Sequence, residues 1–137
     1  MLKSITLLML TLFTYSHSAL SQESFNDGKI SVTSEVLNYE DRANDKFYKY
    51  YNFTVKNGSS ENQKIELIIN YKQNGVQKSS QTRDENLVLE LEPGETVSGD
   101  LQNKKMLTLF KSFLPGNSGK KASSSNIEVV SIEVNYL

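Results

Sequence analysis

The sequence contains no cysteine, no tryptophan and only one histidine, His17. Without cysteine the chain has no disulfide, no thiolate metal ligand, no cysteine nucleophile and no N-terminal cysteine for lipid attachment. Histidine is the side chain that proteins use most often for proton transfer near neutral pH and for binding transition metals. Since His17 lies in the apolar N-terminal segment, residues 22–137 lack the groups for Ser-His-Asp catalysis, Cys-His catalysis and histidine-based zinc sites.

Long apolar runs are also scarce. The N-terminal segment has a positive charge at Lys3, a short apolar stretch over residues 5–13 and small residues over 16–21. This is the layout of a secretory signal peptide, and the stretch is too short to span a bilayer. We predict a signal peptide at residues 1–21, cleaved before Gln22 or, as a competing site, after Ser18. An uncleaved anchor is the alternative.

The rest of the chain, residues 22–137, is expected to form one exported domain, periplasmic or extracellular. It keeps 14 of the 15 basic residues and all 16 acidic ones, so its net charge is −2. A charge this small favours neither nucleic acid nor an anionic membrane as a partner. No further apolar run is long enough for a transmembrane segment. An exported domain without disulfides favours a bacterial source.

The most structured pattern lies in residues 47–55, where five of nine positions are aromatic. Apolar and polar positions alternate there with the period of a half-buried strand, and Asn57-Gly58 follows as a turn signal. One predicted face carries Phe47, Tyr51, Phe53 and Val55, and the other carries Tyr48, Tyr50, Asn52 and Thr54. We therefore predict that this segment is the central strand of an all-β domain.

Turn signals separate further strand candidates at intervals of 8–14 residues, including Asn74-Gly75 and Pro93-Gly94. The candidates are residues 29–38, 64–72, 76–82, 87–91, 96–101, 106–114 and 127–136. Segment 106–114 also fits helical spacing, but its neighbours favour a strand. A bulge or a strand end is expected near Leu37, and a bulge near Val129-Val130, where the alternation changes parity. Residues 22–28, 39–46 and 115–126 are expected to be polar connections.

These patterns predict an all-β fold, a two-sheet sandwich of immunoglobulin or fibronectin type with seven to eight antiparallel strands. The segments Phe53-Thr54-Val55-Lys56-Asn57-Gly58-Ser59 and Leu91-Glu92-Pro93-Gly94-Glu95-Thr96 resemble those of small exported bacterial immunoglobulin-like modules. The resemblance covers residues 28–137 and implies a fold only. It carries over no functional residue.

Two surfaces are candidates for binding. Tyr48 and Tyr50, with Asn52 beside them, would form an outward aromatic platform for a sugar ring or an aromatic partner. The alternative is that they pack under a loop or against neighbouring strands. The polar strand with Val76, Lys78 and Ser80 is expected at a sheet edge, where a partner protein could add a strand.

Other charged groups are expected to be solvated. Glu90, Glu92 and Glu95 cluster near a turn, as a carboxylate-dependent hydrolase would need, but the pattern favours surface charge. A loop with calcium-type oxygen ligands does not match the EF-hand spacing; it contains Glu40, Asp41, Asn44 and Asp45. Asn52 and Asn57 each begin an N-glycosylation sequon.

The sequence thus predicts a non-enzymatic, exported module for protein interaction, adhesion or assembly, with no cofactor and no metal. Its expected partner is another envelope or extracellular protein. A small carbohydrate-binding module that uses the exposed tyrosines is the alternative.

Overall fold

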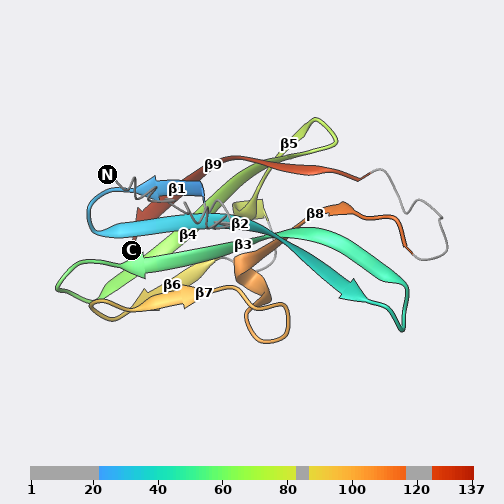
Figure 1. The fold of residues 1–137 in the computed structure, drawn as a ribbon. Coiled ribbons are helices and arrows are strands. Elements are labelled where there is room, and N and C mark those ends of the chain that lie inside the picture. The colour runs from blue at the N-terminus through green and yellow to red at the C-terminus, as the bar shows by residue number, and fades with distance from the viewer. Residues whose placement is uncertain (1–21, 83–86, 117–124) are drawn as a thin grey trace, which may run out of the picture.

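The computed structural model describes residues 22–82, 87–116 and 125–137 (Figure 1). Within them the fold is all-β, with two antiparallel sheets and no α-helix. The strands are β1 (Gln22–Asn26), β2 (Ile30–Asp41), β3 (Lys46–Asn57), β4 (Gln63–Gln73), β5 (Val76–Ser79), β6 (Val88–Leu91), β7 (Thr96–Ser98), β8 (Thr108–Phe113) and β9 (Ile127–Tyr136). Two 3-10 turns, η1 (Ser80–Thr82) and η2 (Lys105–Leu107), precede β6 and β8. The predicted signal peptide lies outside the described residues.

The first sheet, here called sheet A, has the order β1-β2-β3-β7, with β8 also paired to β3. The prediction that the aromatic segment is a central strand is confirmed, because β3 pairs with β2 on one side and with β7 and β8 on the other. The register of β2 with β3 runs unbroken from Ile30↔Asn57 to Asp41↔Lys46. The prediction of a bulge or a strand end near Leu37 is therefore wrong, and the expected 39–46 connection shrinks to a tight turn.

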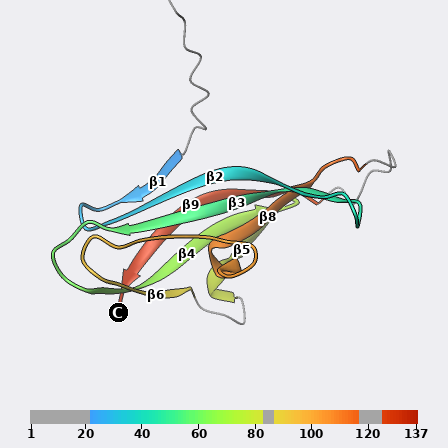
Figure 2. The same ribbon diagram turned by 60° about the horizontal axis from the view of Figure 1, so that its bottom comes forward.

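The second sheet, sheet B, is built on β4. Strand β9 pairs with one edge of β4, while β5 and β6 pair with the two ends of its other edge. The predicted bulge in β9 is confirmed, since Asn70 pairs with Ser131 and Tyr71 with Val129, which leaves Val130 unpaired and 54% exposed. Figure 2 shows the sheets from a second direction.

The hydrophobic core lies between the two sheets. Alternation within the predicted strands places fourteen apolar side chains on the inner faces of the two sheets. Ten of them are buried: Ile30, Val32, Phe53, Val55, Ile65, Leu67, Ile69, Leu87, Leu91 and Ile132. The other four are partly exposed: Phe47, Tyr51, Leu89 and Val134. The prediction missed Leu107, Leu109 and Ile127, which are also buried. Leu107 ends a 3-10 turn and Ile127 precedes the bulge, so neither follows the period-two pattern on which the prediction rested.

The β2–β3 hairpin extends past this core. Its turn lies at the opposite end of the molecule from β1 and from the C-terminal end of β9 (Figures 1 and 2). Val36 has the same parity in β2 as Ile30 and Val32, yet it is 46% exposed whereas they are fully buried. Sheet B therefore covers the first part of the hairpin and leaves its outer part to be stabilised by other contacts.

One strand was not predicted. The polar segment 22–28 contains β1, which pairs with β2 and raises the strand number to nine among the described residues. Segment 106–114 is a strand over β8, as favoured, preceded by the turn η2.

Candidate binding groove

The outer part of sheet A carries a groove of about 410 Å³ on its solvent face. We call it the aromatic groove. Its lining is Tyr39, Tyr48, Tyr50, Leu101, Gln102, Thr108 and Phe110. Strands β2, β3 and β8 supply the aromatic side chains, and the segment between β7 and η2 supplies Leu101 and Gln102. The β2–β3 hairpin, β8 and one loop thus meet at one site.

Strand register explains why the rings gather. Tyr39 lies opposite Tyr48 across the β2–β3 pair, and Tyr50 lies opposite Phe110 across the β3–β8 pair. Opposite residues of antiparallel strands share a face of the sheet, so all four rings lie on the outer face. The rings of Tyr39 and Tyr48 stack with centroids 4.7 Å apart. Tyr48 also lies 5.8 Å from Phe110 and 6.3 Å, edge to face, from Tyr50.

The predicted platform of Tyr48 and Tyr50 is therefore part of a larger aromatic surface. Both side chains are half-buried, because neighbouring rings and the adjoining loop cover part of them. The prediction missed Tyr39 and Phe110. A hairpin with a tight turn near residue 43 would have placed Tyr39 opposite Tyr48, but the charged segment looked like a longer connection.

The surroundings of Tyr48 and Tyr50 disfavour ionisation of their hydroxyls and raise their pKa values. Burial, followed by the negative charges of Glu35 and Asp100, raises the pKa of Tyr50. Burial, followed by the neighbouring hydroxyls of Tyr39 and Tyr50, raises the pKa of Tyr48. At neutral pH these hydroxyls are therefore uncharged hydrogen-bond donors beside two acidic groups.

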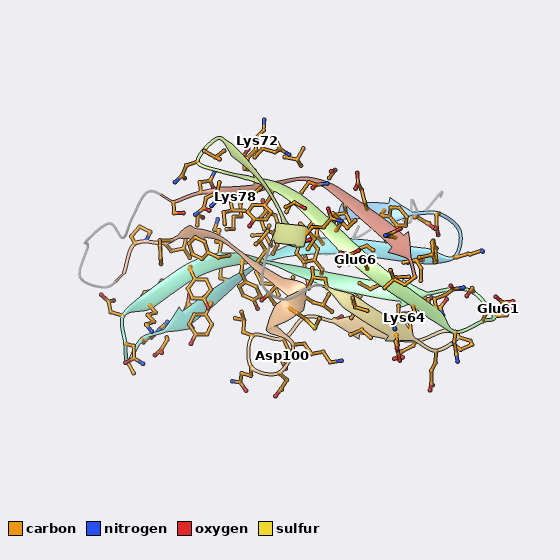
Figure 3. The ribbon with its side chains drawn as sticks, turned by 180° about the vertical axis from the view of Figure 1, so that it is seen from behind. Glu61, Lys64, Glu66, Lys72, Lys78 and Asp100 are labelled. Carbon is orange, nitrogen blue, oxygen red and sulfur yellow. The ribbon has the colours of Figure 1, made fainter. Side chains whose placement is uncertain are left out.

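Asp100 is held in place by its own loop. Its carboxylate accepts hydrogen bonds from the Gln102 amide at 2.8 Å and from Asn103 Nδ2 at 3.0 Å, and these bonds lower its pKa. Figure 3 shows Asp100 on this loop, at the far side of the molecule from Lys72 and Lys78. The carboxylate therefore stays charged near the groove over the whole neutral range.

Asn52 does not lie on the platform where the sequence placed it. It is only 8% exposed, and its Oδ1 has no hydrogen-bond partner among the described residues. A Cβ atom on Gly99 would lie 2.3 Å from this oxygen. Asn52 is opposite Thr108 in the β3–β8 register, so it lies beside the groove as a buried polar group.

The predicted edge strand is shorter than expected. Val76 is 60% exposed, and Lys78 Nζ donates a hydrogen bond to Gln73 Oε1 at 2.6 Å. Ser80 is not at the edge, which corrects the prediction. It is 2% exposed, and its Oγ accepts a hydrogen bond from the Ile69 amide at 2.9 Å. Ser80 thus fills the interval between β5 and β6 along the edge of β4.

The acidic trio lies in a second groove of about 370 Å³ near the β6–β7 turn. Glu90 is 3.5 Å from Lys64 in an exposed ion pair, and Glu95 Oε1 accepts a hydrogen bond from the Glu92 amide at 3.2 Å. None of the three is buried. A glycosidase acid needs a carboxyl group whose pKa is raised by burial, and these side chains lack that environment.

Three of the residues considered as calcium ligands, Glu40, Asp41 and Asn44, form a hydrogen bond or an ion pair within their own loop. Asp41 accepts hydrogen bonds from the Asn44 amide and side chain, and Arg42 lies 3.6 Å from Glu40. In the part of the chain that the structure describes, no group of three or more His, Cys, Asp or Glu side chains is arranged to hold a metal ion.

No protein-family model, no curated protein and no solved structure shows significant similarity to this chain. Across the described ranges, no helix has the length and apolar character needed to cross a membrane. A function must therefore be argued from the surface itself.

Proposed function

We propose that this chain is a non-enzymatic, exported binding module with an immunoglobulin-like sandwich, and that it binds its partner through the aromatic groove. The observation that carries the proposal is the groove: four aromatic rings gather on one solvent-facing surface beyond the core. Isolated exposed aromatic residues are common, but a grouped aromatic surface in a concave site is typical of recognition.

The immunoglobulin-like part of the proposal is supported by topology. Sheet A holds β1, β2, β3, β7 and β8, and sheet B holds β9, β4, β5 and β6. The chain crosses between the sheets after β3, after β6 and after β8. Immunoglobulin-type sandwiches likewise divide consecutive antiparallel strands between two packed sheets.

Two further parts of the proposal, export and the absence of catalysis, are supported by the sequence and by the exposure of the acidic side chains. Residues 1–21 have the layout of a signal peptide, and residues 22–137 contain no histidine and no cysteine. No acidic side chain that the structure describes is buried. These features leave few groups with the perturbed proton affinity that acid–base catalysis requires.

The test is capture of partners from the envelope and culture medium of the source organism on the immobilised exported chain. We compare it with a Tyr48→Ala/Tyr50→Ala variant and with Leu137→Ala as a control for the loss of an exposed apolar side chain. Leu137 is 61% exposed, and the C-terminus lies at the opposite end of the molecule from the hairpin turn. Loss of a specific protein or polysaccharide in the groove variant alone supports the proposal. Capture that is equal in all three chains contradicts it.

A second candidate is addition of a partner strand to β5. Among the described residues β5 pairs only with β4, and Val76 is largely exposed. In a two-residue hairpin the flanking pair is hydrogen-bonded, so the outward amides of β5 belong to Gln77 and Ser79. Proline at Gln77 would remove one outward donor and spare the hairpin. Capture abolished by Gln77→Pro but retained by the groove variant would favour this edge.

A further inference from the structure

We propose that the ligand of the aromatic groove is an uncharged sugar ring of a glycan, held by its apolar face on the tyrosines and by its hydroxyls on the acidic rim. The inference rests on the proposed function of the groove and names the chemistry of the bound group.

The first argument is the amphipathic lining. Tyr39, Tyr48 and Phe110 present carbon surfaces whose ring faces are electron-rich. A pyranose has C–H groups on its faces and hydroxyls around its edge. Such a ring can lay polarised C–H groups on the aromatic surface and keep its hydroxyls at the periphery. The groove volume of about 410 Å³ lies within the usual range for small-ligand sites.

The second argument is the set of hydrogen-bonding groups around the rings. Tyr48 and Tyr50 offer protonated phenol groups, and Gln102 offers a side-chain amide within the lining. Glu35 and Asp100 are close enough to Tyr50 to influence its ionisation. Carboxylates accept strong hydrogen bonds from sugar hydroxyls. A sugar ring carries hydroxyl groups around its whole edge. It can therefore pair with these phenol, amide and carboxylate groups better than an aromatic side chain of a peptide can.

The third argument is charge. Among the side chains that the structure describes, the groove lining contains no lysine or arginine, and the negative charges of Glu35 and Asp100 act on Tyr50. Lys104 offsets part of the charge of Asp100 from within the same loop. The remaining field disfavours uronate, sulfate and phosphate groups, which would be brought next to like charge without a basic partner. Neutral glycans carry no such penalty.

The experiment is binding of the exported chain to an array of neutral glycans, acidic glycans and tyrosine- or phenylalanine-rich peptides. Hits are then titrated by calorimetry and by tyrosine fluorescence, which is not masked because the chain has no tryptophan. We expect saturable binding to at least one neutral glycan. The Tyr48→Ala/Tyr50→Ala variant should weaken it by about tenfold or more, since lost stacking on two rings approaches 1.4 kcal/mol. Leu137→Ala should leave it within about twofold.

The outcomes separate this inference from the proposed function. Binding of an acidic glycan or an aromatic peptide, lost in the groove variant, overturns the uncharged sugar but keeps the groove as a binding site. Neutral-glycan binding that is unchanged in the groove variant overturns the groove as the site. If the array shows no neutral glycan bound, the inference fails, and the capture experiment alone decides whether the groove binds another partner.

Discussion

The hydroxyl of Tyr136, near the end of β9, donates a hydrogen bond to Oδ2 of Asp27, in the turn between β1 and β2. The two residues are 109 positions apart, and the bond joins sheet B to sheet A at the end of the molecule opposite the β2–β3 turn. Asp27 Oδ1 also accepts hydrogen bonds from the Lys29 amide at 2.9 Å and the Ile30 amide at 2.8 Å. The Asp27 carboxylate therefore stabilises the β1–β2 turn and holds the end of β9 next to it.

This pairing predicts a pH dependence at both ends of the scale. Burial, followed by the bond and charge of Asp27, raises the pKa of Tyr136 to about 12. Burial alone would raise the pKa of Asp27, but the bonds from Tyr136, Ile30 and Lys29 lower it overall. A raised tyrosine pKa stabilises the fold below its unfolded value near 10, and the gain is lost as pH rises towards 12. A lowered aspartate pKa stabilises the fold above about 4, and the gain is lost as pH falls below that value.

Asp27→Asn should therefore lower the pKa of Tyr136 towards the ordinary value of about 10. Ultraviolet absorbance of tyrosinate, followed during an alkaline titration, measures this change. Tyr136→Phe identifies the transition that belongs to this residue. Titration curves for the wild type and Asp27→Asn that coincide above pH 10 would contradict the role of the hydrogen bond.

A second prediction concerns Asn57, whose side chain is fully buried. Its Nδ2 donates to the carbonyl oxygens of Glu61 at 2.8 Å and of Leu91 and Glu92 at 3.1 Å, and its Oδ1 accepts from the Ser59 amide at 3.0 Å. The side chain ties the β3–β4 loop to the β6–β7 turn. Asn57→Ala should lower the free energy of unfolding by about 2–4 kcal/mol, because several buried groups lose their partners.

Denaturant unfolding of Asn57→Ala, beside the exposed control Asn62→Ala, measures this loss. The same burial bears on the sequon at Asn57, since a glycan on Nδ2 would replace its hydrogen bonds to the three carbonyls. A eukaryotic host that glycosylates this position should secrete less folded protein. Equal stability of the two asparagine variants would show that the network contributes little.

A third prediction concerns Ser80. Its Oγ accepts a hydrogen bond from the Ile69 amide and donates one to the Leu67 carbonyl oxygen, so it pairs with backbone groups of β4 that a neighbouring strand would otherwise pair with. Ser80→Ala leaves the buried Ile69 amide without its acceptor, which should cost about 1–3 kcal/mol. Ser60→Ala is the matched control, because Ser60 is exposed. Hydrogen exchange of the Ile69 amide should become faster in Ser80→Ala relative to the rest of β4. Unchanged protection would mean that another group satisfies this amide.

A fourth prediction concerns Gly99, which adjoins the groove loop. A Cβ atom there would lie 2.3 Å from Asn52 Oδ1 and 2.5 Å from the Leu107 carbonyl oxygen. Gly99→Ala should therefore shift the loop that carries Leu101 and cost about 1–3 kcal/mol. Gly58→Ala serves as the control, since its closest contact would be an ordinary 3.6 Å. Melting temperatures measure the cost, and a Gly99→Ala chain as stable as Gly58→Ala would contradict this packing.

Much of the fold could be predicted from alternation and turn chemistry. Asn74 and Gly75 both have positive φ, 51° and 83°, as the predicted hairpin requires, and Gly94 has φ 76° in the predicted turn after Pro93. The central position of β3 followed from its density of aromatic and β-branched residues. These features depend on residues close together in the chain, where local geometry restricts the choices.

The errors share a different cause. Strand β1 was predicted as a polar connection because its five residues show no clear alternation, and it is placed only by pairing with β2. Ser80 was assigned to an exposed edge, but the chain turns inward after β5 and uses the hydroxyl to satisfy β4. In both cases the deciding hydrogen bonds join one segment to a neighbouring strand, which the pattern within a single segment does not contain.

The sequence by itself determined the all-β class, the central aromatic strand and the outward side of Tyr48 and Tyr50, because side-chain direction in a strand follows parity alone. Only the tertiary structure decided that these tyrosines join Tyr39 and Phe110 in a groove, and that Asn52 lies buried beside it. That difference arises because a strand fixes the face on which a side chain lies, whereas its neighbours depend on register with other strands and on the course of a loop.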